Sequence, residues 1–166
     1  MQFKLKSISK RAVSKAIEKA MRYRLLNEPS EAESICLDVL KADNNNQKAL
    51  IVLLLALTDR FGIDEALSDT QAEDVTKRLQ DEYEQAYYSG IICERKGKAS
   101  LTHRGPSANY DACEWLCEAM TCFKKAETIR PKDNDDALLR WNACARIIMS
   151  NHLDPRPPET FEPSLE

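Results

Sequence analysis

The sequence has few glycines and no long apolar run. Only four glycines occur in 166 residues, too few for the many tight turns of an all-β chain. The longest apolar stretch, residues 49–58, is far shorter than the roughly 18 residues that would suggest a membrane span. Apolar residues instead recur at helical spacing along the chain. We therefore predict an all-α fold without a membrane segment.

Motifs for catalysis or for a bound cofactor are also lacking. The chain contains no phosphate-binding loop, no dinucleotide fingerprint and no His-Glu-x-x-His pattern. A cysteine nucleophile with His103 as its base would have no oxyanion turn and no third group to orient the histidine. We expect a protein that is not an enzyme and holds no cofactor.

Cysteines are present, but their spacing does not suit a metal. No Cys-x-x-Cys pair occurs, and Cys113 and Cys117, four residues apart, would supply only two of the four ligands of a structural zinc site. All six cysteines lie in apolar helical surroundings, and we see no secretory leader. This pattern predicts reduced, buried thiols in a cytoplasmic protein. The six are Cys36, Cys93, Cys113, Cys117, Cys122 and Cys144.

Positive charge is concentrated at the N-terminus. Residues 1–24 hold eight Lys or Arg and one acidic residue, Glu18, whereas the whole chain has a net charge of −3. Residues 1–12 are interpreted as a basic arm; the basic stretch either meets an acidic surface or is merely a solvated helix face, with mitochondrial targeting as a minor alternative. Nucleic-acid binding would use this arm with Tyr23, but the sequence pI of about 5.6 argues against a broad phosphate-binding stripe.

One stretch near the C-terminus carries a specific packing pattern. Ala119, Phe123 and Ala126 follow one helical face, and Pro131 ends the helix because it cannot donate the next backbone hydrogen bond. Small residues permit a neighbouring helix to come close, and the phenyl ring fills the space between them. This pattern resembles the second helix of a tetratricopeptide repeat.

The resemblance implies helix pairs repeated at a period of about 34 residues. Three repeats can be placed, over residues 13–46, 47–82 and 83–134, with a capping helix over residues 135–151. Residues 98–109 are predicted to be an exposed loop inserted into the third repeat, with Gly97 at the preceding turn. Residues 152–166, rich in proline and acidic residues, are predicted to be a disordered tail. The expected architecture is a short right-handed solenoid of about seven helices.

In this family the first helices of successive repeats line a concave groove. The resemblance therefore implies an apolar floor with basic residues at its edge, suited to a peptide or an amphipathic helix. The predicted groove residues are Ile17, Met21, Arg24, Lys48, Val52, Leu55, Tyr87, Tyr88, Ile91 and Arg95.

Three alternatives bear on this groove. The strip could be a sealed core, or it could pair with a second copy to form a homodimer. The family's carboxylate clamp, which holds the C-terminal tails of heat-shock chaperones, requires Lys, Asn and Arg side chains. At the corresponding positions the chain has none of these: the residues are Ile17, Met21, Val52, Glu84 and Tyr88. We therefore expect another protein as partner, but not a chaperone tail.

Overall fold

Seven α-helices follow one another in the computed structural model, which describes residues 2–63, 69–103, 105 and 107–157. A short 3-10 turn, η1 (Lys10–Ala12), precedes them, and no strand occurs in these residues. The prediction of an all-α fold with seven helices is confirmed. The helices are α1 (Val13–Leu25), α2 (Pro29–Ala42), α3 (Gln47–Thr58), α4 (Asp69–Lys77), α5 (Glu82–Thr102), α6 (Ala108–Thr128) and α7 (Asp136–Ser150).

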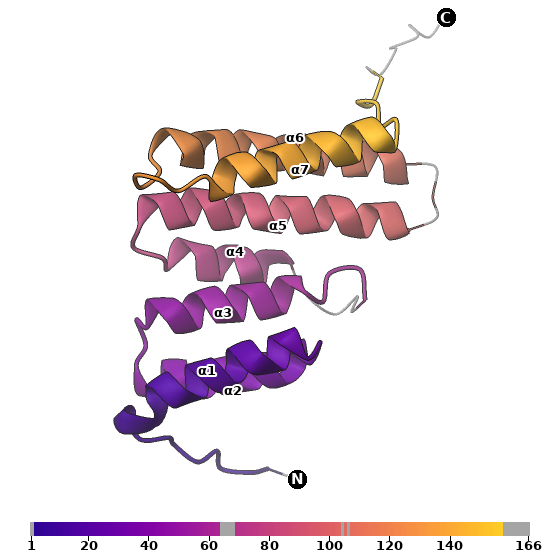
Figure 1. The fold of residues 1–166 in the computed structure, drawn as a ribbon. Helices are drawn as coiled ribbons and strands as arrows, with labels where there is room; N and C mark the ends of the chain where they lie inside the picture. The colour runs from indigo at the N-terminus through magenta and orange to yellow at the C-terminus, as the bar shows by residue number, and fades with distance from the viewer. Residues whose placement is uncertain (1, 64–68, 104, 106, 158–166) are drawn as a thin grey trace, which may run out of the picture.

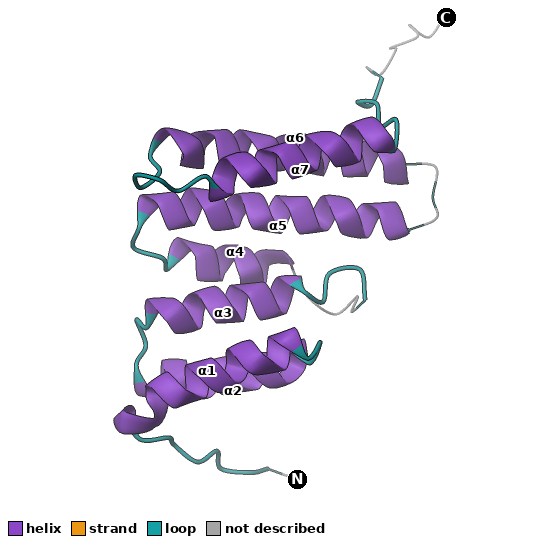
Figure 2. Cartoon of the chain, viewed as in Figure 1, coloured by secondary structure: helices purple, strands orange, loops and turns teal. Residues whose placement is uncertain are grey.

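The helices are stacked in chain order, with α1 and α2 at one end and α6 and α7 at the other (Figure 1). Each helix packs against the next along the chain, and α1 also contacts α3. Short loops join most of them (Figure 2). Among the described residues, no helix has both the length and the apolar character needed to cross a bilayer.

Local signals explain several helix boundaries. The Asn46 side chain accepts a hydrogen bond from the Ala49 amide at 3.0 Å, and Asp81 accepts one from the Glu84 amide at 2.9 Å. These side chains cap α3 and α5 by satisfying amides that have no partner within the helix. Pro29 begins α2, where its missing N–H costs nothing.

The interior is built from two adjoining clusters of apolar side chains. One is formed mainly by α1 to α4, the other by α5 to α7, and Leu55 and Tyr88 contact both. Phe123 is fully buried in the second cluster between the buried Ala119 and Ala126, as the packing pattern predicted. A Cβ atom at Gly90 would lie 2.5 Å from the Phe123 ring, so α5 and α6 come close where the glycine permits it.

The predicted loop over residues 98–109 is wrong for most of its length. Instead, α5 continues to Thr102 and α6 begins at Ala108, so that the additional residues lengthen two helices to 21 residues each. Gly97 lies inside α5, where a Cβ atom would meet Leu116 Cγ at 2.8 Å. This glycine permits close helix packing and does not make a turn. Residues 104 and 106 lie outside the described part.

The predicted tail begins with residues that pack on the helices. Leu153 is buried, and the Arg156 guanidinium forms ion pairs with Asp111 and Glu114 of α6. Leu153 and Arg156 therefore anchor the start of this segment on the second cluster and on α6, contrary to the prediction of disorder there. The rest of that predicted tail, residues 158–166, lies outside the described residues, as do residues 64–68 of the predicted second repeat.

Candidate protein-interaction face

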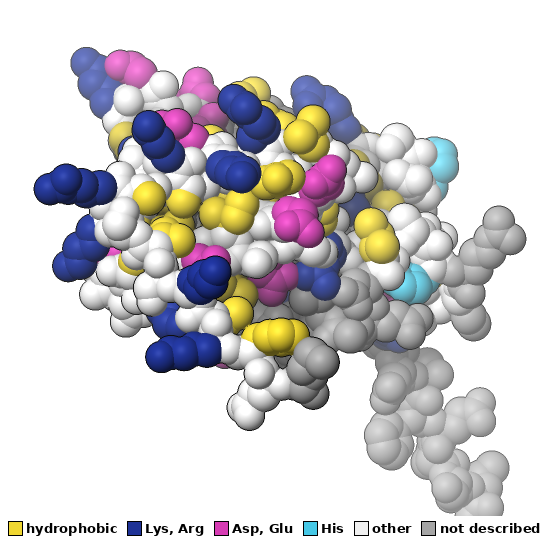
Figure 3. Space-filling view, turned by 90° about the horizontal axis from the view of Figure 1, so that it is seen from below, with side chains coloured by type: hydrophobic (Ala, Val, Ile, Leu, Met, Phe, Trp, Pro, Cys, Tyr) yellow, Lys and Arg dark blue, Asp and Glu magenta, His cyan; other side chains and the backbone are white. Residues whose placement is uncertain are grey.

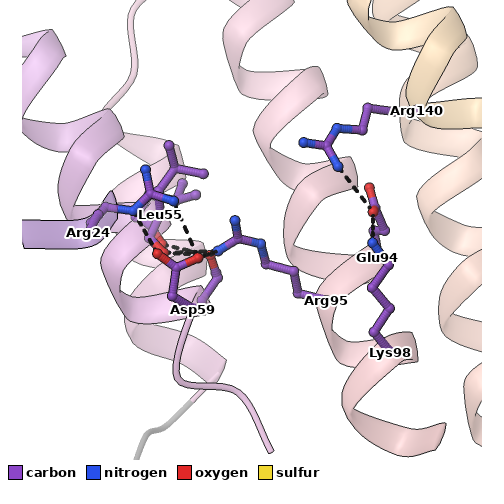
Figure 4. Close-up of polar contacts among 9 residues, drawn as sticks. Arg24, Leu55, Asp59, Glu94, Arg95, Lys98 and Arg140 are labelled. Atoms are coloured by element: carbon purple, nitrogen blue, oxygen red, sulfur yellow. Dashed lines mark hydrogen bonds and ion pairs between the residues drawn. The ribbon is translucent and has the colours of Figure 1, made fainter. Parts of the chain in front are cut away.

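Ionic contacts link the four odd-numbered helices along one side of the stack. Arg24 of α1 and Arg95 of α5 both pair with Asp59, the residue that follows α3 (Figure 4). Further along, Arg140 of α7 pairs with Glu94 of α5. We call this side, where α1, α3, α5 and α7 approach one another, the odd-helix face.

Asp59 is the centre of the first group of contacts. Arg24 Nε donates to Asp59 Oδ2 at 2.7 Å, and a second nitrogen, Nη2, donates to Oδ1 at 3.3 Å. Arg95 Nη1 donates to the Leu55 carbonyl at 2.9 Å, to Thr58 Oγ1 at 2.6 Å and to Asp59 Oδ1. Burial lowers the pKa of Arg95, although the Asp59 carboxylate opposes this shift. Both guanidinium groups are thus held against α3, and they fix the spacing of three helices.

Glu94 is the centre of the second group and is only 1% exposed. Lys98 and Arg140 both donate to its Oε1 atom, with Arg140 at 3.3 Å. Its Oε2 atom is buried without a hydrogen-bond partner in the described part of the chain. Glu94 lies at the wall of a cavity of about 550 Å³ between the end of α3, the second half of α5, and α7. The cavity walls therefore carry both cations and carboxylates.

A row of tyrosines continues the face along α5. The Tyr83 and Tyr87 rings stack with centroids 5.7 Å apart, and Tyr88 meets Tyr87 edge-on at 5.2 Å. Burial raises the pKa of the Tyr88 hydroxyl from 10.0 to about 12. All three rings are half-buried. Each thus offers part of an aromatic surface to solvent while the remainder packs inside.

The structure separates the predicted floor residues into two groups. Ile17, Val52 and Ile91 are buried within the core clusters and present almost no surface. Leu55, Tyr87 and Tyr88 are half-buried and do reach the surface. The apolar part of the face is therefore narrower than the repeat pattern implied.

The remaining predicted residues, Met21 of the floor and the basic edge residues Arg24, Lys48 and Arg95, are also divided. Met21 and Lys48 are exposed, and Met21 lies on the same stripe of α1 as Arg24. Arg24 and Arg95 are engaged with Asp59 and are not free to orient a ligand. The predicted set did not include Lys98 or Arg140. The i, i+4 spacing from Glu94 could have indicated Lys98, whereas Arg140 lies 46 positions from Glu94 and no local pattern links them.

Thiol chemistry does not add a site on this face. Burial raises the pKa values of Cys36 and Cys144 to about 12, which keeps these thiols protonated and unreactive. Cys117 is exposed and Cys93 and Cys122 are half-buried, so the prediction that all six cysteines are buried is correct only for Cys36, Cys113 and Cys144. Within the described ranges, no group of three or more potential metal-ligating side chains comes together.

Comparisons with known proteins give no further guide to the site. No family model matches the chain, and neither the curated proteins nor the solved structures include a match.

Proposed function

We propose that this protein is a non-catalytic interaction module that binds a peptide or an amphipathic helix of another protein across the odd-helix face. The observation that carries the proposal is the row of half-buried tyrosines beside Leu55, at the junction of the two core clusters. Tyrosine supplies a large and stiff contact area together with a polar hydroxyl, and it is enriched where proteins bind one another.

The polar groups of the face would serve different purposes. Arg24, Asp59 and Arg95 hold α1, α3 and α5 together, so that a ligand meets a surface that is already ordered. Preorganisation of this kind lowers the entropic cost of binding. Met21 and Lys48 project from α1 and α3, where they could contact the ligand directly.

Affinity capture with matched variants tests this proposal. Met21→Glu places a charge on the face at a side chain that is 50% exposed, and Leu37→Glu places one on α2 at a side chain that is 54% exposed. We expect Met21→Glu to reduce recovery of the partner about tenfold and Leu37→Glu to leave it unchanged. Equal recovery with both variants would contradict the proposal.

Sedimentation of the wild-type protein and of Met21→Glu distinguishes binding of another protein from binding of a second copy of the chain. If the wild-type protein sediments as a dimer at high concentration and Met21→Glu makes it a monomer, the face serves self-association. If it sediments as a monomer at all concentrations while still capturing its partner, the face serves a foreign segment.

A further inference from the structure

The outer side of α1 forms a second surface, separate from the odd-helix face. With about 100° between successive helical residues, Met21 and Arg24 point toward the odd-helix face, while Lys19 and Arg22 point away from it. α1 is the first helix of the stack, and α2 and α3 pack against its inner side. Its outer side carries exposed Lys15, Lys19 and Arg22.

This outer side is hollowed into a cavity of about 470 Å³ that we call the α1 groove. It is lined by Lys15, Glu18, Lys19, Arg22, Tyr23 and Leu26. Their spacings of three and four residues place them along one stripe of the helix. Apolar atoms of Tyr23 and Leu26 contribute to the groove, and Leu26 is 61% exposed even though it is a large aliphatic side chain.

The α1 groove carries a net positive charge, because its three cations outnumber its one carboxylate, Glu18. Lys15, Lys19 and Arg22 make no ion pair within the described residues, and Lys19 lies over the Tyr23 ring at 5.8 Å from its centroid. In contrast, Arg24, on the opposite side of the same helix, pairs with Asp59. Seen from the end of the stack where α1 and α2 lie, Lys and Arg side chains are spread around exposed apolar ones, with Asp and Glu side chains between them (Figure 3). An acidic partner would compensate this charge.

We infer that the α1 groove binds an acidic amphipathic helix of a partner protein. Leucine-like side chains of that helix would cover Tyr23 and Leu26, and its carboxylates would lie near Lys15, Lys19 and Arg22. The basic arm, with exposed Lys4, Lys6, Lys10 and Arg11, would add long-range attraction. This surface is separate from the odd-helix face, so either binding proposal can be refuted while the other still holds.

The shape of the site favours a helix over other anionic partners. Long cationic side chains flank the apolar atoms of the groove along one stripe of α1, and a partner helix can lie along this stripe with its apolar side chains on Tyr23 and Leu26. Single-stranded nucleic acids are commonly held by exposed aromatic faces on which their bases stack, whereas the one aromatic residue of the groove, Tyr23, is half-buried.

Fluorescence anisotropy with a labelled synthetic helix tests the inference. The probe is a helix of about 18 residues with leucines on one face and glutamates elsewhere, and its control has lysine in place of each glutamate. The wild-type protein should bind the acidic probe at least about tenfold more tightly than the basic one, and added salt should weaken binding.

Two double variants of equal charge locate the site. Lys19→Glu with Arg22→Glu should weaken acidic-probe binding about tenfold or more, whereas Lys124→Glu with Lys132→Glu, at the other end of the stack, should change it less than about twofold. Equal loss with both pairs would mean that net charge alone attracts the probe, and it would overturn the inference. Tighter binding to phosphatidylserine vesicles or to single-stranded DNA than to the acidic helix would also overturn it.

Discussion

Replacing Asp59 with asparagine should loosen the odd-helix face without changing its shape. The Asp59 carboxylate accepts hydrogen bonds from Arg24 and Arg95, and the side chains of these three residues are only 21% to 24% exposed. Charge-assisted hydrogen bonds contribute about 1.5–3 kcal/mol each when buried, and exposure to solvent reduces this figure. Asparagine keeps one acceptor oxygen but loses the charge. We therefore expect Asp59→Asn to lower the free energy of unfolding by about 1–3 kcal/mol.

Urea denaturation followed by circular dichroism measures this change, with Glu118→Gln as the control. Glu118 is an exposed carboxylate on α6, and its replacement should alter the free energy of unfolding by less than about 0.5 kcal/mol. A double-mutant cycle between Asp59→Asn and Arg95→Gln should give a coupling energy of at least about 0.5 kcal/mol. If Asp59→Asn changes the free energy of unfolding as little as Glu118→Gln does, or if the cycle shows no coupling energy, the Asp59 carboxylate does not hold the three helices together.

Three further predictions concern the interior. Gly97→Ala should lower the free energy of unfolding by about 1–3 kcal/mol because its Cβ would meet Leu116, whereas Gly105→Ala, with nothing within 4 Å, should have little effect in the same denaturation assay. A thiol reagent should label Cys117 in the native protein and Cys36 only after unfolding, as measured by mass spectrometry of the digested protein. Labelling of Cys36 before Cys117 would contradict this prediction. Burial raises the pKa values of Cys36 and Cys144 to about 12 from an ordinary 9.0, so the unfolded chain loses these protons first. These two thiols should therefore leave the free energy of unfolding unchanged below about pH 9 and lower it as the pH rises toward 12. The decrease should be shallower in Cys36→Ala, and the same dependence on pH in this variant and in the wild type would contradict the prediction.

The sequence predicted best where packing depends on local pattern. Ala119, Phe123 and Ala126 share a helical face, and all three are buried in the structure. Gly97 was misinterpreted because a glycine that permits close packing cannot be distinguished locally from one that makes a turn. Its neighbour Leu116 belongs to another helix, and only the three-dimensional arrangement brings the two together.

The site was predicted less completely for a similar reason. A repeat pattern assigns residues to one side of a helix, but it does not say how deeply they lie. Ile17, Val52 and Ile91 are on the predicted side and are nevertheless buried by neighbouring helices. Arg95 was placed correctly on α5, while its engagement with Asp59 depends on a contact across 36 positions in the chain. How deeply a side chain is buried, and which ion pair it forms, depend on the tertiary packing of the helices.

Site-specific photo-crosslinking tests the central claim of partner binding at the odd-helix face most directly. A photoreactive amino acid would be placed at Met21 or Lys48 on that face and, as a control, at Lys124 on α6, all of which are exposed. After irradiation in extracts of the cells that make the protein, the two positions on the face should link to the same protein and Lys124 should not. Crosslinks to that protein from Lys124 alone, or from none of the three positions, would contradict the claim.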